Sequence, residues 1–162
     1  MRNAIRKKTA SLGILVFVMV FASMVYSHCQ IPCGIYGDQA RFDMLAEHIT
    51  TIEKSMQQIT ELSQKDTPNF NQIVRWVQNK EKHADELSHI VTYYFMAQRI
   101  KPAGNNKGKA YEEYIRKLTL LHEMLVYSMK AKQTTDLSNV EKLKTLLAEF
   151  RVVYFQVDTH KH

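Results

Sequence analysis

Four metal-binding groups lie within the six residues from His28 to Cys33. They are the imidazole of His28, the thiols of Cys29 and Cys33, and the free α-amine that His28 would carry if the chain were cut after Ser27. An α-amine has a reference pKa of about 8, so it can bind a metal near neutral pH. The amide nitrogen of Cys29, once deprotonated, would complete a chelate ring with that amine. Amine, amide and two thiolates form a planar donor set that favours nickel or copper over zinc.

The two cysteines also allow simpler interpretations. Cys29 and Cys33 are the only cysteines of the chain, and two cysteines in an oxidising compartment usually form a disulfide. In that case the protein would be an exported helical-bundle binding protein with a structural Cys29–Cys33 disulfide and no catalytic metal. A third interpretation is a copper- or nickel-binding protein without turnover. The residues by themselves leave all three open.

The segment before His28 is typical of an export signal. Basic residues precede an apolar run from Leu12 to Tyr26, and Val25 and Ser27 then stand at positions −3 and −1 of a cut before His28. The run has about 15 residues, whereas a membrane-spanning helix needs about 20. We therefore expect residues 1–27 to be a cleaved signal peptide. The mature protein would be exported (periplasmic or extracellular), without stable membrane association after cleavage.

Charge and composition exclude one class of partner. The chain has 22 basic and 16 acidic residues, a formal charge of +6. Four of the basic residues precede His28, which leaves 18 against 16, or +2, for the remainder. That remainder has no basic stripe alternating with aromatic residues, so we expect no nucleic-acid partner. The length of 162 residues and the hydrophobic fraction of 45% predict one domain with a substantial core.

Residues 37–162 have the pattern of a helical domain. Apolar residues recur every three or four positions, as on one face of a helix. The pattern predicts helices at about residues 38–64, 70–99, 110–132 and 137–155. Breaks at Pro68 and Pro102 separate the first three segments. No segment alternates as a strand does, so the predicted fold is an all-α, antiparallel up-and-down four-helix bundle.

The same periodicity predicts burial and local roles. Asp38 is expected to cap the first helix after a turn at Gly37. In the third helix the predicted buried stripe is Tyr111, Ile115, Leu118, Leu121, Leu125 and Met129. The methionines predicted to fill the core are Met44, Met56, Met96, Met124 and Met129. Among the histidines, His122 is expected to be partly buried and hydrogen-bonded, and His48 and His89 to be single surface residues.

The stretch His28-Cys29-x-x-Pro32-Cys33-Gly34-x-Tyr36 resembles the nickel-binding motif of nickel-dependent superoxide dismutase. We call residues 28–36 the nickel hook. The resemblance continues into the helices and covers most of residues 28–155. Its further matching stretches are Gln39-Ala40-Arg41, Arg75-Trp76-Val77, Lys80-Glu81 and Lys101-Pro102.

The resemblance implies a set of roles. Cys29 and Cys33 would be thiolate nickel ligands, and His28 would contribute its amine and an axial imidazole nitrogen. Tyr36 would act in catalysis beside the open axial face. The implied enzyme uses a redox-active Ni(II)/Ni(III) centre to disproportionate superoxide to O2 and H2O2. It assembles as a homohexamer, and a protease must expose His28.

Three residues depart from the pattern of that family. Gln30 replaces a common Asp, Asp43 stands where a Glu supports the axial histidine, and His83 replaces an Arg or Gln. The turn at Gly37-Asp38 is also one residue shorter than the usual turn. These changes concern the surroundings of the axial imidazole, while the ligands themselves are intact.

The cleavage site gives the first testable prediction. We expect N-terminal sequencing and intact mass of the mature protein to place its first residue at His28. Any residue left before His28 would turn the α-amine into an amide and remove a nickel ligand. A mature chain that begins at Ser27 or earlier would therefore contradict the proposed donor set.

Overall fold

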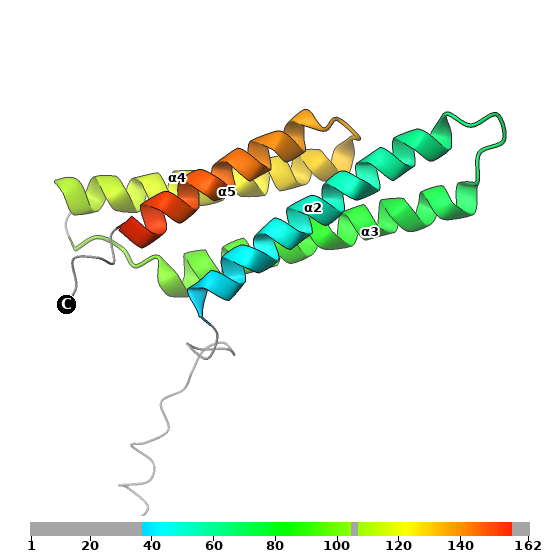
Figure 1. Ribbon diagram of the computed structural model, residues 1–162. Coiled ribbons are helices and arrows are strands. Elements are labelled where there is room, and N and C mark those ends of the chain that lie inside the picture. Colours follow the sequence, from blue (N-terminus) through cyan, green and yellow to red (C-terminus); the bar gives the residue numbers. More distant parts are fainter. Residues whose placement is uncertain (1–36, 105–106, 157–162) are drawn as a thin grey trace, which may run out of the picture. The chain divides into compact units, whose positions relative to one another are not determined.

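The computed structural model describes residues 37–104 and 107–156. Its helices are α2 (Asp38–Ser63), α3 (Phe70–His89), η1 (Ile90–Arg99), α4 (Lys109–Gln133) and α5 (Ser138–Gln156), shown in Figure 1. The element η1 is a π-helix that continues α3. The described residues contain no strand, which confirms the prediction of an all-α four-helix bundle. The predicted signal peptide and nickel hook lie outside the described residues.

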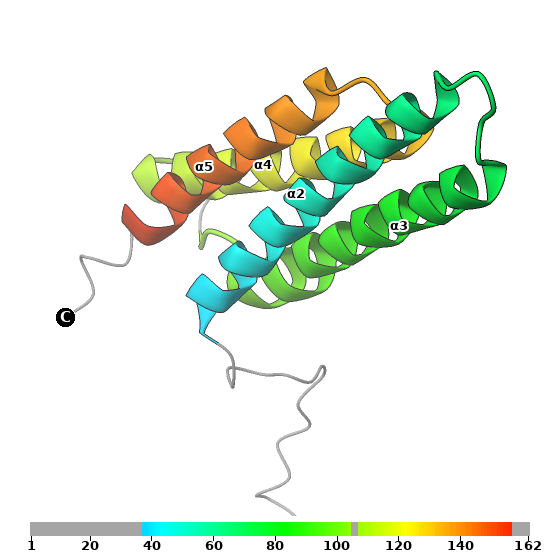
Figure 2. The ribbon, with the colours of Figure 1, turned by 45° about the vertical axis from the view of Figure 1, so that its right-hand side comes forward.

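With α3 and η1 counted as one continuous helix, the four helices pack in up-and-down order. Helices α2 and α3 form one antiparallel pair and α4 and α5 a second, while α3 also contacts α4 and α2 contacts α5 (Figures 1 and 2). Short connections favour this arrangement, because each helix must turn back beside the one before it. As a result, the start of α2 lies at the same end of the bundle as the last residues of η1 and of α5 (Figure 2).

An aromatic cluster fills the core at that end. Phe42 of α2, Phe95 of η1 and Phe150 of α5 are completely buried. The ring centroid of Phe42 lies 5.0 Å from that of Phe95 and 5.3 Å from that of Phe150. Phe95 and Phe150 meet edge to face at 5.0 Å. Such pairs stabilise a core by about 0.5–1.5 kcal/mol beyond the burial of their area. Three helices are thus locked together close to the first residue of α2.

The second predicted helix ends where expected, at Arg99, but its last ten residues are π-helical. The amide of Ile100 donates to the carbonyl of Phe95 at 2.9 Å, which is the five-residue spacing of a π-helix. Hydrophobic periodicity could not distinguish this π-helix from an α-helix, because both helices present an apolar stripe.

The predicted burial stripe of the third helix is partly wrong. Ile115 is 40% exposed and Met129 55% exposed. The buried face of α4 is instead Leu120, Leu121, Met124, Ser128 and Ala131. Leu121 and Met124 were predicted to be buried, whereas Ser128 and Ala131 were missed because the pattern counts large apolar residues and overlooks small ones. The Ser128 hydroxyl donates to the carbonyl of Ala84 at 2.9 Å, so this small face lies against α3.

The methionine predictions hold only in part. Met56 and Met124 are completely buried, and Met96 packs against the core. Met44, however, is 39% exposed, so its assignment to the core, like that of Met129, was wrong. Its side chain lies beside Arg41, whose guanidinium Nη1 is 3.4 Å from the sulfur.

A buried lysine joins α3 to the end of α4. The ammonium of Lys80 donates to the carbonyl oxygens of Lys132, at 2.5 Å, and Thr134, at 3.1 Å. A cation at this place satisfies carbonyls that the helix itself leaves without partners. Burial lowers the pKa of Lys80, and the nearby charge of Glu81 acts in the opposite direction.

The aromatic cluster gives a prediction about stability. Phe42→Ala should lower the free energy of unfolding by about 3–5 kcal/mol, because it removes a ring that no other side chain can replace in the core. Urea denaturation followed by circular dichroism measures this change. Met129→Ala is the matched control, since Met129 is 55% exposed, and its effect should stay within about 0.5 kcal/mol. Equal losses in the two variants would contradict the assigned core.

Candidate metal centre

The residues predicted to bind nickel, His28, Cys29 and Cys33, and the predicted catalytic Tyr36 lie outside the described residues. Within the described part of the chain, no group of three or more His, Cys, Asp or Glu side chains is placed to hold a metal ion. Nor does any helix there have the length and apolar character needed to cross a membrane. The structure therefore bears on the centre through the residues where the chain passes from Tyr36 into α2.

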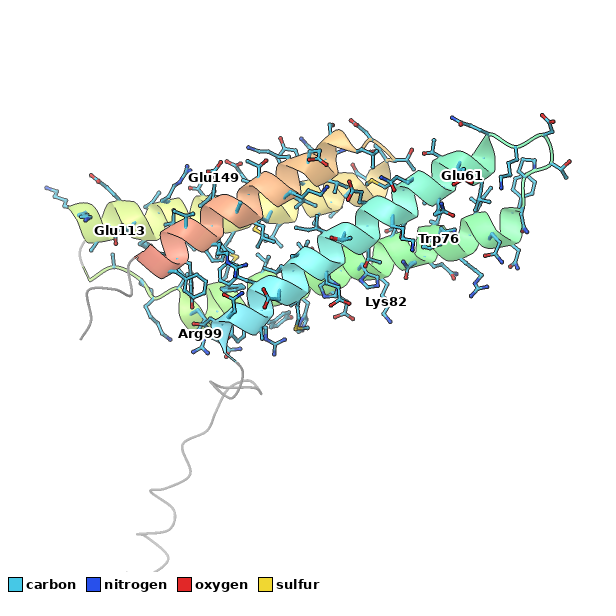
Figure 3. All side chains as sticks on the ribbon, in the orientation of Figure 1. Glu61, Trp76, Lys82, Arg99, Glu113 and Glu149 are labelled. Carbon is cyan, nitrogen blue, oxygen red and sulfur yellow. The ribbon has the colours of Figure 1, made fainter. Side chains whose placement is uncertain are left out.

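At this point Asp38 joins three elements. One carboxylate oxygen, Oδ1, accepts a hydrogen bond from the Tyr94 hydroxyl at 2.5 Å, and Oδ2 accepts one from Tyr154 at 2.8 Å. The Nε of Arg99 lies 2.9 Å from Oδ1, and its Nη2 donates to the Tyr94 hydroxyl at 2.9 Å. We call Asp38, Tyr94, Arg99 and Tyr154 the Asp38 cluster. Figure 3 shows Arg99 beside the first turn of α2.

The predicted capping role of Asp38 was wrong. The N-cap of α2 is Gly37, without a side-chain cap, and Asp38 is the first helical residue. Its carboxylate therefore faces the tyrosines of η1 and α5. A negative charge in the first turn is still favoured by the helix dipole.

Both tyrosines of the cluster remain hydrogen-bond donors over the physiological pH range. Burial raises the pKa of Tyr94, and its hydrogen bond to Asp38 raises it further, although Arg99 opposes the shift. Burial and the same carboxylate also raise the pKa of Tyr154. Because the two residues are only 4% and 7% exposed, each hydroxyl needs an acceptor within the protein. Asp38 supplies it for both.

Guanidinium groups surround this end of the bundle. Arg41 and Arg99 lie over the ring of Tyr94, at 5.0 and 4.9 Å from its centroid. Arg151 lies 5.8 Å from the ring centroid of Phe42, and its Nη1 is 3.7 Å from a carboxylate oxygen of Asp43. Positive charge over an aromatic face is attracted by the ring's electron density.

The three departures from the family pattern have different surroundings. Gln30 lies outside the described residues. Asp43 is exposed and accepts a hydrogen bond from the amide of Gln39 at 2.7 Å. His83 contacts His48 across α2 and α3, with 2.8 Å between their Nδ1 atoms.

This contact corrects one of the three histidine predictions. His48 is a half-buried partner of His83 and not a single surface residue. His89 is exposed, as expected, and stacks on Tyr93 with 4.5 Å between ring centroids. His122 is exposed, so its predicted partial burial was wrong.

The His48–His83 contact requires at least one neutral ring. A hydrogen bond between two Nδ1 atoms needs a donor on one side and an unprotonated acceptor on the other. Burial lowers the pKa of His48 and the charge of His83 lowers it further, while Glu86 and Glu47 oppose the shift. Protonation of both rings would place two positive charges side by side between the helices, which is unfavourable.

Comparison with known proteins identifies the family. The family model for nickel-containing superoxide dismutase matches residues 23–158, which include the nickel hook and the whole described bundle. The chain therefore belongs to the nickel-containing superoxide dismutase family. Searches of curated proteins and of solved structures found no significant match.

Family membership establishes the general chemistry. The protein is an oxidoreductase whose substrate is superoxide and whose cofactor is nickel. The donor set of the hook fits that metal, because thiolates and nitrogen donors suit nickel, whereas carboxylate and carbonyl oxygens suit magnesium or calcium. His28, Cys29 and Cys33 provide such donors within six residues.

Sequence reasoning missed the Asp38 cluster and the His48–His83 pair. The members of the cluster come from α2, η1 and α5, so no local motif contains them. One weak signal existed, namely that Asp38 follows the hook's Tyr36 by two residues. Tyr94 and Arg99 are five residues apart, whereas neighbouring side chains on an α-helix are three or four apart. The sequence therefore did not predict that these two side chains share a face.

The histidine pair predicts a pH dependence of stability. The lowered pKa of His48 means that the unfolded chain binds more protons than the native protein as the pH falls below about 6.5. Neutral His48 therefore makes its full contribution to the free energy of unfolding above that pH. This contribution decreases as the pH falls toward the lowered pKa that His48 has in the folded protein. Urea denaturation of the metal-free protein between about pH 7.5 and 5 measures this slope.

Replacing one partner tests the assignment. His83→Gln should make the pH slope shallower without abolishing it, because the burial that lowers the pKa of His48 remains while the neighbouring charge of His83 is removed. His122→Gln is the matched control, since His122 is exposed on α4, and should keep the slope of the unmodified protein. Identical slopes in all three proteins would show that the pair does not titrate as described.

Proposed function

We propose that the protein is an exported superoxide dismutase whose nickel is held by His28, Cys29 and Cys33. The observation that carries this proposal is the span of the family match, which includes the hook motif together with the bundle. His28 would provide its α-amine and imidazole, and the cysteines would provide thiolates. When bound, nickel would supply a centre that cycles between Ni(II) and Ni(III), because thiolate and amide donors stabilise the higher oxidation state.

The reaction needs electron transfer in both directions and two protons. One superoxide loses an electron and leaves as O2, and a second gains an electron and two protons and leaves as H2O2. We assign Tyr36 the task of holding water and moving a proton at its hydroxyl beside the substrate. The protein residues would position the donors and the proton source, and the redox step itself belongs to the cofactor.

Charge near the start of α2 supports an anionic substrate. Arg41, Arg99 and Arg151 contribute three positive charges there, against the carboxylates of Asp38 and Asp43. A net positive potential raises the local concentration of small anions and their rate of encounter. Superoxide is such an anion.

Processing and assembly form part of the same proposal. A protease would remove residues 1–27, so that export and completion of the donor set depend on one cut. The protein would then assemble as a homohexamer, as the family resemblance implies. Apolar side chains exposed on α3, namely Phe70, Val74 and Val77, support an assembly that covers them.

Replacing a thiolate ligand tests the proposed site. The mature protein should contain about one nickel per chain and remove superoxide. Cys29→Ser should lose both properties, because an alcohol is a far poorer nickel donor than a thiolate. Metal analysis and a superoxide-removal assay measure the two effects, and His122→Gln serves as a control that should retain both.

Two other results would overturn the proposal. If nickel-free protein has no titratable thiols, Cys29 and Cys33 form a structural disulfide. If nickel is bound through the thiols but superoxide is not removed, the protein binds metal without turnover.

A further inference from the structure

The strongest structural feature outside the predicted ligands is the Asp38 cluster. The Asp38 carboxylate accepts hydrogen bonds from two tyrosine hydroxyls and forms an ion pair with a guanidinium. All three partners come from elements that are distant in the sequence. The side chains of Asp38 and Arg99 are 26% and 28% exposed, so the ion pair is partly shielded from water. The four side chains thereby fix the first residue of α2 against η1 and α5.

The π-helix makes this arrangement possible. In an α-helix, residues five positions apart are separated by about 140° around the axis, so Tyr94 and Arg99 would face different directions. In η1 the Arg99 guanidinium donates to the Tyr94 hydroxyl, and both side chains contact Asp38. Meanwhile Phe95 stays fully buried in the aromatic cluster. π-Helical turns occur frequently at functional sites, which is consistent with a functional role for the Asp38 cluster.

The covalent chain connects Asp38 to the nickel hook. Tyr36 is two residues before Asp38, and Cys33 is five residues before it. Only one residue of the chain separates Tyr36 from Asp38, and only four separate Cys33 from it. Restricting Asp38 therefore restricts both the proposed proton source and a proposed ligand.

We propose that the Asp38 cluster is the positioning element of the nickel hook. This inference rests on the proposed function, because it assigns to Asp38 a role toward the ligands named there. A fixed Asp38 leaves less conformational freedom to be lost when the hook binds nickel, and preorganisation of this kind strengthens binding. Asp38 acts through Tyr36 and Cys33 and is not itself a ligand.

Asp38→Asn is the direct test. The amide keeps the shape of the carboxylate but removes its charge and one of its two acceptor oxygens. One tyrosine hydroxyl therefore loses its acceptor, and Arg99 loses its ion pair. We expect the mature variant to bind nickel about tenfold more weakly in competition with a chelator, at the lower end of the effect of residues that support ligands. The thiolate-to-nickel absorption of the loaded variant should keep its position, since the ligands are unchanged.

A second measurement follows the cluster without nickel. Hydrogen exchange of the metal-free protein should become faster in the first turn of α2 in Asp38→Asn. Tyr154→Phe removes a single hydrogen bond and keeps the charge of Asp38, so it should give a smaller change in the same direction. This variant keeps the test decisive if Asp38→Asn does not fold.

Asp136→Asn is the matched control. Asp136 precedes α5 and accepts a hydrogen bond from the amide of Ser138 at 2.9 Å. It is thus separated from Tyr154 by most of the length of a helix, at the other end of the bundle (Figure 1). The same chemical change at that place should leave nickel affinity unaltered. Lys80→Met removes a buried cation that binds the C-terminal end of α4 and has no contact with Asp38 among the described residues. It controls for a general loss of stability.

The outcomes separate the two proposals. Faster exchange with unchanged nickel affinity in Asp38→Asn would overturn the positioning role and leave the cluster as a structural contact. An equal loss of affinity in Lys80→Met would also overturn it. If the unmodified protein does not bind nickel through its thiols, the proposed function fails and this inference fails with it.

Discussion

A metal site that uses the chain terminus as a ligand is connected to its protein on one side only. In the proposed centre the α-amine of His28 is free, so every covalent restraint on the hook passes through Tyr36 and Gly37 into α2. The first residue of α2 is Asp38, whose carboxylate is held by donors from η1 and α5. In this proposal, the packing at the end of the bundle and the order of the hook are coupled through the Asp38 side chain.

The architecture could be predicted from the sequence because the bundle obeys a single periodic rule. Apolar residues at spacings of three and four located all four rods, and Pro68 and Pro102 marked two of the breaks. Two features of the helices escaped this rule for physical reasons. Small residues such as Ser128 and Ala131 bury a face without contributing to an apolar pattern. The π-helix changes the angle per residue while keeping an apolar stripe, so periodicity could not reveal it.

The proposed metal ligands and the residues proposed to support them differ in how far the sequence reveals them. The proposed ligands fall within six consecutive residues, so their chemistry can be read directly from the sequence. The Asp38 cluster joins positions separated by as many as 116 residues, and the His48–His83 contact joins positions 35 apart. Such contacts depend on how the helices turn about their axes. Turning one helix about its axis by the angle of a single residue would separate the side chains that make these contacts.

The widened register of η1 also affects how chain length can vary in this protein. Removing one residue between Ile90 and Gln98 would turn Arg99 about the helix axis by the angle of one residue and carry its guanidinium away from Asp38. Insertions or deletions in the connection at 101–108 would leave that geometry intact, because the helices on either side could keep their packing. In relatives that retain the Asp38 cluster, gaps in a sequence alignment should therefore fall after Arg99 and spare the π-helix before it.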